Sequence, residues 1–158
     1  MVLGLLTTSF LSIVCFIITA VIGMQGRSEI AQHFLFGVFA TFLVTLAHSM
    51  TMFYFIGTGK QVKDLVVNDT MGSAFIQRTR VFKARVFPPA LWAMLLTMAV
   101  TILGGGVHTR LIPHWVHGIL AAAALYFNLV AFWREAKYMI EHNMLMDELE
   151  KRLQTRNP

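Results

Sequence analysis

The chain has few charged residues and only one cysteine. Asp, Glu, Lys and Arg make up 13% of its 158 residues, against roughly a quarter in soluble domains. The single Cys15 excludes an internal disulfide and a cysteine-rich metal site. Hydrophobic residues reach 56%, which is more apolar surface than a soluble fold of this length can bury. The composition therefore indicates a membrane protein.

Charge is absent altogether from four long stretches, residues 1–26, 30–59, 86–109 and 111–133. Each can hold the helix of about 20 residues that crosses roughly 30 Å of hydrocarbon. The runs are continuous and do not alternate, which argues against a β-barrel. The first run has no basic residue before it and no small-residue cleavage site after it, so we interpret it as a permanent span. The sequence predicts an all-α integral membrane protein with a four-helix antiparallel transmembrane domain over residues 1–135, its spans at 3–24, 33–57, 87–107 and 113–135.

Basic residues are concentrated on one side of the predicted spans. Residues 58–86 hold six of them, whereas the connections at 25–32 and 108–112 hold only Arg27 and Arg110. The positive-inside rule then places both termini in the cytoplasm (N-in/C-in), together with an amphipathic loop at 58–86 and a helical tail at 136–158. The expected location is a bacterial inner membrane. Prolines at 88, 89 and 113 are expected to begin the third and fourth helices.

The tail carries a short apolar stripe with steps of three and four residues. This spacing is typical of a helix that packs along one face. We expect the stripe to dock on other membrane subunits or on the 58–86 loop. The remaining partner is the lipid bilayer, and we expect no nucleic acid because no recognition motif accompanies the basic residues. The stripe consists of Met139, Met146, Leu149 and Leu153, with His142 completing the series.

The sequence offers no recognisable catalytic arrangement of its own. We find no nucleophile beside a base and count no carboxylate within the spans. That argues against a hydrolase, and it argues against a small transporter or channel, because such proteins generally keep ionisable residues inside the membrane. At most, the chain is expected to be one subunit of an oxidoreductase complex.

Histidines are the polar residues that stand out in the predicted spans. His33 and His48 are 15 residues apart and project from one side of the second span. His114, His117 and Asn128 share a face of the fourth span. Two polar stripes are therefore expected to meet inside the bundle.

A b-type haem needs two axial imidazoles at similar depth, from different helices. His33 and His117 satisfy this condition near the outer surface and are the predicted ligands of the haem iron. His108 and His114 lie at a similar depth and are alternative candidates for the axial ligands. His48 lies about 22 Å further along its helix and is either a second ligand site or part of an interhelical hydrogen bond.

This layout resembles the four-helix membrane cytochromes b, in which histidines on facing helices hold one or two haems. The resemblance covers the second helix and the start of the fourth, and it implies a bundle that binds haem b. The chain departs from the two-haem pattern because only one of its helices carries a widely spaced histidine pair.

Other ligands and functions stay open at this point. His108, His114 and His117 could bind copper or zinc, and a quinone carbonyl could accept a hydrogen bond from a histidine or Asn128. We expect a small membrane subunit of a respiratory-type redox complex. The alternative is a cofactor-free structural or assembly subunit, and a small transporter or channel comes third.

Overall fold

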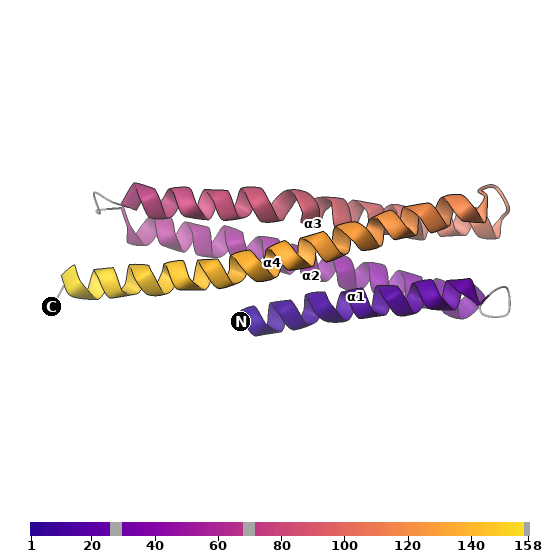
Figure 1. Ribbon diagram of the computed structural model, residues 1–158, viewed down its shortest axis with the longest axis horizontal. Coiled ribbons are helices and arrows are strands. Elements are labelled where there is room, and N and C mark those ends of the chain that lie inside the picture. Colours follow the sequence, from indigo (N-terminus) through magenta and orange to yellow (C-terminus); the bar gives the residue numbers. More distant parts are fainter. Residues whose placement is uncertain (26–29, 68–71, 157–158) are drawn as a thin grey trace.

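The described part of the chain forms a bundle of four helices. The computed structural model describes residues 1–25, 30–67 and 72–156. Each helix packs against the next along the chain, and the last returns to the first, in an up-down-up-down arrangement (Figure 1). This confirms the all-α prediction. The helices are α1 (Val2–Met24), α2 (Ile30–Leu65), α3 (Gly72–His108) and α4 (His114–Arg156).

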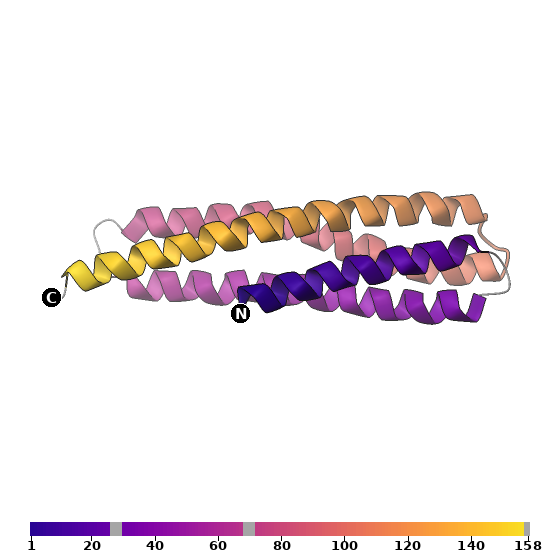
Figure 2. The same cartoon turned by 60° about the horizontal axis from the view of Figure 1, so that its bottom comes forward.

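All four helices are long and apolar enough to cross a membrane. They differ in length, because α1 has 23 residues whereas α4 has 43. At 1.5 Å per residue, α1 spans about 35 Å and α4 about 65 Å, against roughly 30 Å of hydrocarbon. In both views α1 therefore covers only part of the bundle's length, and the N-terminus lies well short of the C-terminus (Figures 1 and 2).

The other three helices continue past the start of α1, and we call their residues 58–65, 72–86 and 136–156 the extension. Its inner end still packs against Leu5 of α1. Residues 58–86 were expected to be an amphipathic loop, but most of them prolong α2 and α3. The reason is burial, since Val62, Phe75, Phe82 and Val86 pack into one apolar core with α4. Arg27, Glu29 and Asp69, which entered the charge count, lie outside the described residues.

The tail packs on its own chain. Met139 and Leu149 are fully buried in the extension core, and Met146 and Leu153 pack against it from its edge. Of the two expected positions for this stripe, contact with the 58–86 segment is therefore the one observed. Docking of another subunit through these four residues would require the extension to open.

The prolines divide into two cases. Pro113 directly precedes α4, as expected, and its carbonyl accepts a hydrogen bond from the Val116 N–H at 3.1 Å. Pro88 and Pro89 do not begin α3 but lie inside it, because the extension adds helix before them. Pro89 has no N–H to offer the carbonyl four residues earlier, that of Arg85. The Arg134 guanidinium donates to this Arg85 carbonyl at 3.2 Å and so replaces the missing partner.

The membrane-length part of the bundle has a much smaller apolar core than the extension. Its buried cluster consists of Phe16, Val100 and Ala124, with partly buried neighbours around it. Many of its large side chains, such as Phe39, Phe53 and Ile102, are exposed, as suits a surface that faces lipid. Polar contacts occupy much of the interior instead.

Candidate functional site

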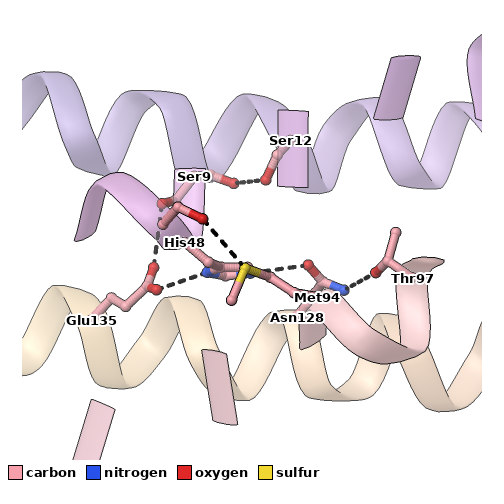
Figure 3. A network of polar contacts seen from close by, with 8 residues as sticks. Ser9, Ser12, His48, Met94, Thr97, Asn128 and Glu135 are labelled. Atoms are coloured by element: carbon pink, nitrogen blue, oxygen red, sulfur yellow. Dashed lines mark hydrogen bonds and ion pairs between the residues drawn. The ribbon is translucent and has the colours of Figure 1, made fainter. Parts of the chain in front are cut away.

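A buried hydrogen-bonded network joins the four helices where the membrane-length bundle meets the extension (Figure 3). Its centre is His48 of α2. The Nδ1 atom of His48 lies 2.7 Å from Glu135 Oε1, and its Nε2 atom lies 3.2 Å from Asn128 Oδ1. His48 is 1% exposed, and Glu135 and Asn128 are 0% exposed. The ring is thus held at both nitrogens by two side chains of α4.

The outer members of the network come from α1 and α3. Ser9 Oγ donates to Glu135 Oε2 at 3.2 Å, and Ser12 Oγ donates to the Ser9 carbonyl at 2.8 Å. Asn128 Nδ2 donates to Thr97 Oγ1 at 3.0 Å. The network therefore ties all four helices together at one level.

The sequence pattern of α4 explains why its polar side chains point inward. The buried residues Ala124, Asn128, Ala131 and Glu135 follow steps of four, three and four, which keeps them on one face of a helix. Met139, His142, Leu145 and Leu149 continue this face through the extension. Asn128, Glu135 and His142 consequently recur at intervals of seven residues on the buried side.

Glu135 corrects the expectation that the spans contain no carboxylate. It stands at the last position of the predicted fourth span, next to Arg134. In the structure its side chain turns inward and pairs with His48, whereas that of Arg134 reaches the Arg85 carbonyl. The seven-residue spacing from Asn128 was the available signal. With Glu135 inside the bundle, a lack of ionisable residues no longer speaks against a transporter.

The buried Glu135–His48 pair is stabilised more by hydrogen bonds from neighbouring side chains than by the attraction between its own two groups. Removing two charged groups from water costs several kcal/mol per ion, and only good geometry with further hydrogen bonds repays that cost. Here Ser9 and Asn128 supply those bonds. If one partner were removed, the other would be left buried and unsatisfied.

The second site lies at the opposite end of the bundle, where α2 and α4 begin. The rings of His33 and His117 are in contact edge to face, with centroids 6.1 Å apart and an interplanar angle of 87°. His33 Nδ1 donates to the Thr19 carbonyl of α1 at 2.9 Å. His117 Nδ1 is buried and has no hydrogen-bond partner among the described residues. The structure thus brings together the two histidines that the sequence singled out.

Glycines make room for both rings. A Cβ atom at Gly23 of α1 would lie 2.6 Å from Cε1 of His33, and one at Gly104 of α3 would lie 3.2 Å from Cε1 of His117. The first distance is shorter than any real Cβ contact. Gly23 is therefore required by the position of His33, and Gly104 leaves little space beyond His117.

The other predicted site residues are not gathered with this pair. His108 ends α3 and His114 begins α4, and both are exposed. Within residues 1–25, 30–67 and 72–156, no three His, Cys, Asp or Glu side chains come close enough to hold a metal ion. His108, His114 and His117, which the sequence left open as a copper or zinc site, are therefore not gathered into a group of three ligands among these residues.

The last notable histidine, His142, lies in the extension core. Its ring is in edge-to-face contact with those of Tyr54, Phe55 and Phe82, at centroid distances of 5.6 to 6.0 Å. Neither of its ring nitrogens has a hydrogen-bond partner in the described part of the chain. Burial, helped by the positive charge of Lys83, lowers the pKa of His142 from 6.5 to about 4. The ring is therefore neutral at pH 7.

Comparison of the chain with protein-family models, with curated proteins and with solved structures gave no match. The functional assignment accordingly rests on the residues and contacts described above.

Proposed function

We propose that the chain is a small integral membrane subunit of a respiratory-type redox complex, in a bacterial inner membrane. The extension and both termini lie on the cytoplasmic side. The support is the charge distribution, because eleven of the thirteen Lys and Arg residues belong to the extension or to the end of α4 that leads into it. Arg110, between α3 and α4, then faces the outer side.

The proposed cofactor is a b-type haem held by His33 and His117. The observation that carries this proposal is the meeting of two imidazoles from different helices at one depth, with a centroid distance of 6.1 Å. The bond from His33 Nδ1 to the Thr19 carbonyl fixes that ring and leaves Nε2 to face a ligand. Histidines that bind a metal through one nitrogen are commonly oriented in this way by a carbonyl at the other nitrogen. His117 Nδ1, which has no hydrogen-bond partner within residues 1–25, 30–67 and 72–156, also fits a nitrogen that would meet a ligand.

A haem at this position would supply one-electron transfer, and the chain's own residues would hold and orient the two imidazoles. A quinone in the bilayer is the proposed exchange partner for electrons. Asn128 is a poor recognition group for it, since its amide is bonded to His48, Thr97 and the Ala124 carbonyl. His48 is likewise engaged at both nitrogens, so we propose one haem.

A cofactor-free structural or assembly subunit is the second candidate. It is favoured by the Ser9–Glu135–His48–Asn128–Thr97 network, which fastens four helices without using a cofactor. On this account His33 and His117 would be packing residues of the outer end.

The test that separates the two is a reduced-minus-oxidised visible spectrum of the protein purified from its native membrane in mild detergent. The redox proposal predicts sharp b-type bands, lost in His33→Ala and in His117→Ala. His108→Ala is the matched control, because this histidine is exposed near the same end, and it should keep the bands. A featureless spectrum from correctly folded native-source protein would support the assembly subunit.

A further inference from the structure

The hydrogen bonds of Asn128 fix the position of one proton on His48. Asn128 Nδ2 lies 2.8 Å from the Ala124 carbonyl, which can only accept. The nitrogen of the amide must therefore point there, and the amide oxygen must point at His48 Nε2. Because an amide oxygen also only accepts, Nε2 of His48 must carry a hydrogen.

A second proton is shared between His48 and Glu135. Nδ1 and Oε1 are 2.7 Å apart, so one hydrogen lies between them, whether it is bound to the ring or to the carboxyl group. With both protons present, the pair has no net charge. Without the second proton, a carboxylate would face a bare ring nitrogen, in a place where both side chains are at most 1% exposed, and burial of such a charge is costly. The second proton is thus the one that this site binds.

Three buried polar atoms that have no hydrogen-bond partner among the described residues lead from this pair toward the far end of the extension. They are Thr51 Oγ1 and the two ring nitrogens of His142. Thr51 lies one turn beyond His48 on α2, about 4.5 Å along the axis, and His142 lies two turns beyond Glu135 on α4, about 10.5 Å along it. Tyr54 and Phe55, which follow Thr51 on α2, contact the His142 ring. Buried polar atoms of this kind are usually satisfied by ordered water.

We propose that His48 and Glu135 form a proton-binding site at membrane depth, and that its second proton exchanges with the cytoplasmic side along His142 and Thr51. A proton enters at the unprotonated nitrogen of the His142 ring and leaves from the other nitrogen. Water and the Thr51 hydroxyl pass it on to the Glu135–His48 pair, which has first released its own second proton along the same path to the cytoplasmic side. Each group accepts one proton and donates one, so no charge accumulates on the path.

The charged and polar groups around the path are consistent with proton exchange through the extension and not through the outer side. Burial, with the positive charge of Lys83 of α3 as the smaller cause, lowers the pKa of His142 and keeps its ring neutral. Ser9 of α1 contacts the carboxyl group of Glu135. On the outer side, Asn128 donates to Thr97 Oγ1, which donates to the Ala93 carbonyl at 2.7 Å, and a peptide carbonyl has no proton to pass on. The site therefore opens toward the extension. The inference does not depend on haem.

The first test is ¹⁵N NMR of protein labelled at histidine ring nitrogens, in lipid bilayers, with His48 assigned by its loss in His48→Gln. The proposal predicts a hydrogen on Nε2 in the native protein and in Glu135→Gln, and its loss in Asn128→Leu. An unprotonated Nε2 in the native protein would overturn the assignment of the two protons.

The second test follows deuterium exchange at the His48–Glu135 bond after proteoliposomes are moved into D₂O, read as the isotope shift of the His48 signals. His142→Phe, which suits an aromatic surrounding, and Thr51→Val should each slow the exchange by roughly tenfold, a change of one decade in rate. Thr45→Val is the matched control, because Thr45 donates only within its own helix, and it should exchange at the native rate. Native exchange in His142→Phe with an unchanged unfolding transition would refute the path.

Discussion

His142 makes the stability of the extension depend on pH. Its pKa is about 4 in the folded protein, against 6.5 for an exposed histidine, because the ring is buried and Lys83 is near. The unfolded chain therefore binds a proton first as the pH falls. The contribution of His142 to the free energy of unfolding is therefore complete above pH 6.5, and it is lost progressively as the pH falls from 6.5 to 4.

The size of the effect follows from the two pKa values. Each pKa unit corresponds to 1.36 kcal/mol, so lowering the pH from 7.5 to 5 should cost about 2 kcal/mol of unfolding free energy through His142 alone. At pH 4 the loss should reach about 3 kcal/mol. A substitution that removes the His142 ring should therefore remove this dependence of the unfolding free energy on pH.

The assay is reversible unfolding in mixed micelles at a series of pH values, comparing the native chain with His142→Leu. Both proteins contain the same carboxylates, so the difference between their unfolding free energies at each pH reports on His142 alone. We expect His142→Leu to be the more stable protein at pH 5, with a flatter pH profile. Met146→Leu, a volume-conserving change on the edge of the same core, should keep the native slope. If His142→Leu loses as much stability between pH 7.5 and 5 as the native chain, the argument from burial is wrong.

Three further substitutions test other parts of the structure, each by unfolding in the same micelles. Glu135→Leu should cost about 3–5 kcal/mol by leaving His48 buried and unpaired, whereas the double change with His48→Leu should cost less; equal or additive costs would contradict a coupled pair. Arg134→Met should cost about 1 kcal/mol, because the carbonyl freed by Pro89 loses its donor, and an effect no larger than that of Arg80→Met would contradict this role. Arg110 has a left-handed φ of 62°, so Arg110→Gly should stabilise by about 1 kcal/mol, and a loss of stability would count against the strain.

The helices could be predicted because their signal is local. Long charge-free stretches need only hydropathy to be recognised, and the depths of His33 and His117 follow from helical rise. The continuation of α2 and α3 through residues 58–65 and 72–86 could not be recognised in the same way. Charged residues interrupt the apolar pattern there, and these helices are stabilised by burial of Phe75 and Phe82 against α4, which depends on the tertiary fold.

The inner network was missed for a related reason. Whether Glu135 points to water or to the core is decided by Ser9 of α1 and His48 of α2, and neither of these lies near it in sequence. His48 was considered both as a ligand and as a member of an interhelical hydrogen bond. Its distances to Glu135 and Asn128 show the hydrogen bonds, while haem ligation by His33 and His117 stays a prediction.

The most direct test of the redox account is the amount of haem bound per chain, measured on native-source protein by extraction and absorbance. The account predicts one haem b per polypeptide, because His33 and His117 face each other from different helices and His48 is bonded at both nitrogens, and it predicts none in the His33→Ala, His117→Ala double variant. Two haems per chain would require His48 to leave Glu135 or Asn128, and no haem in intact native protein would contradict the redox assignment itself.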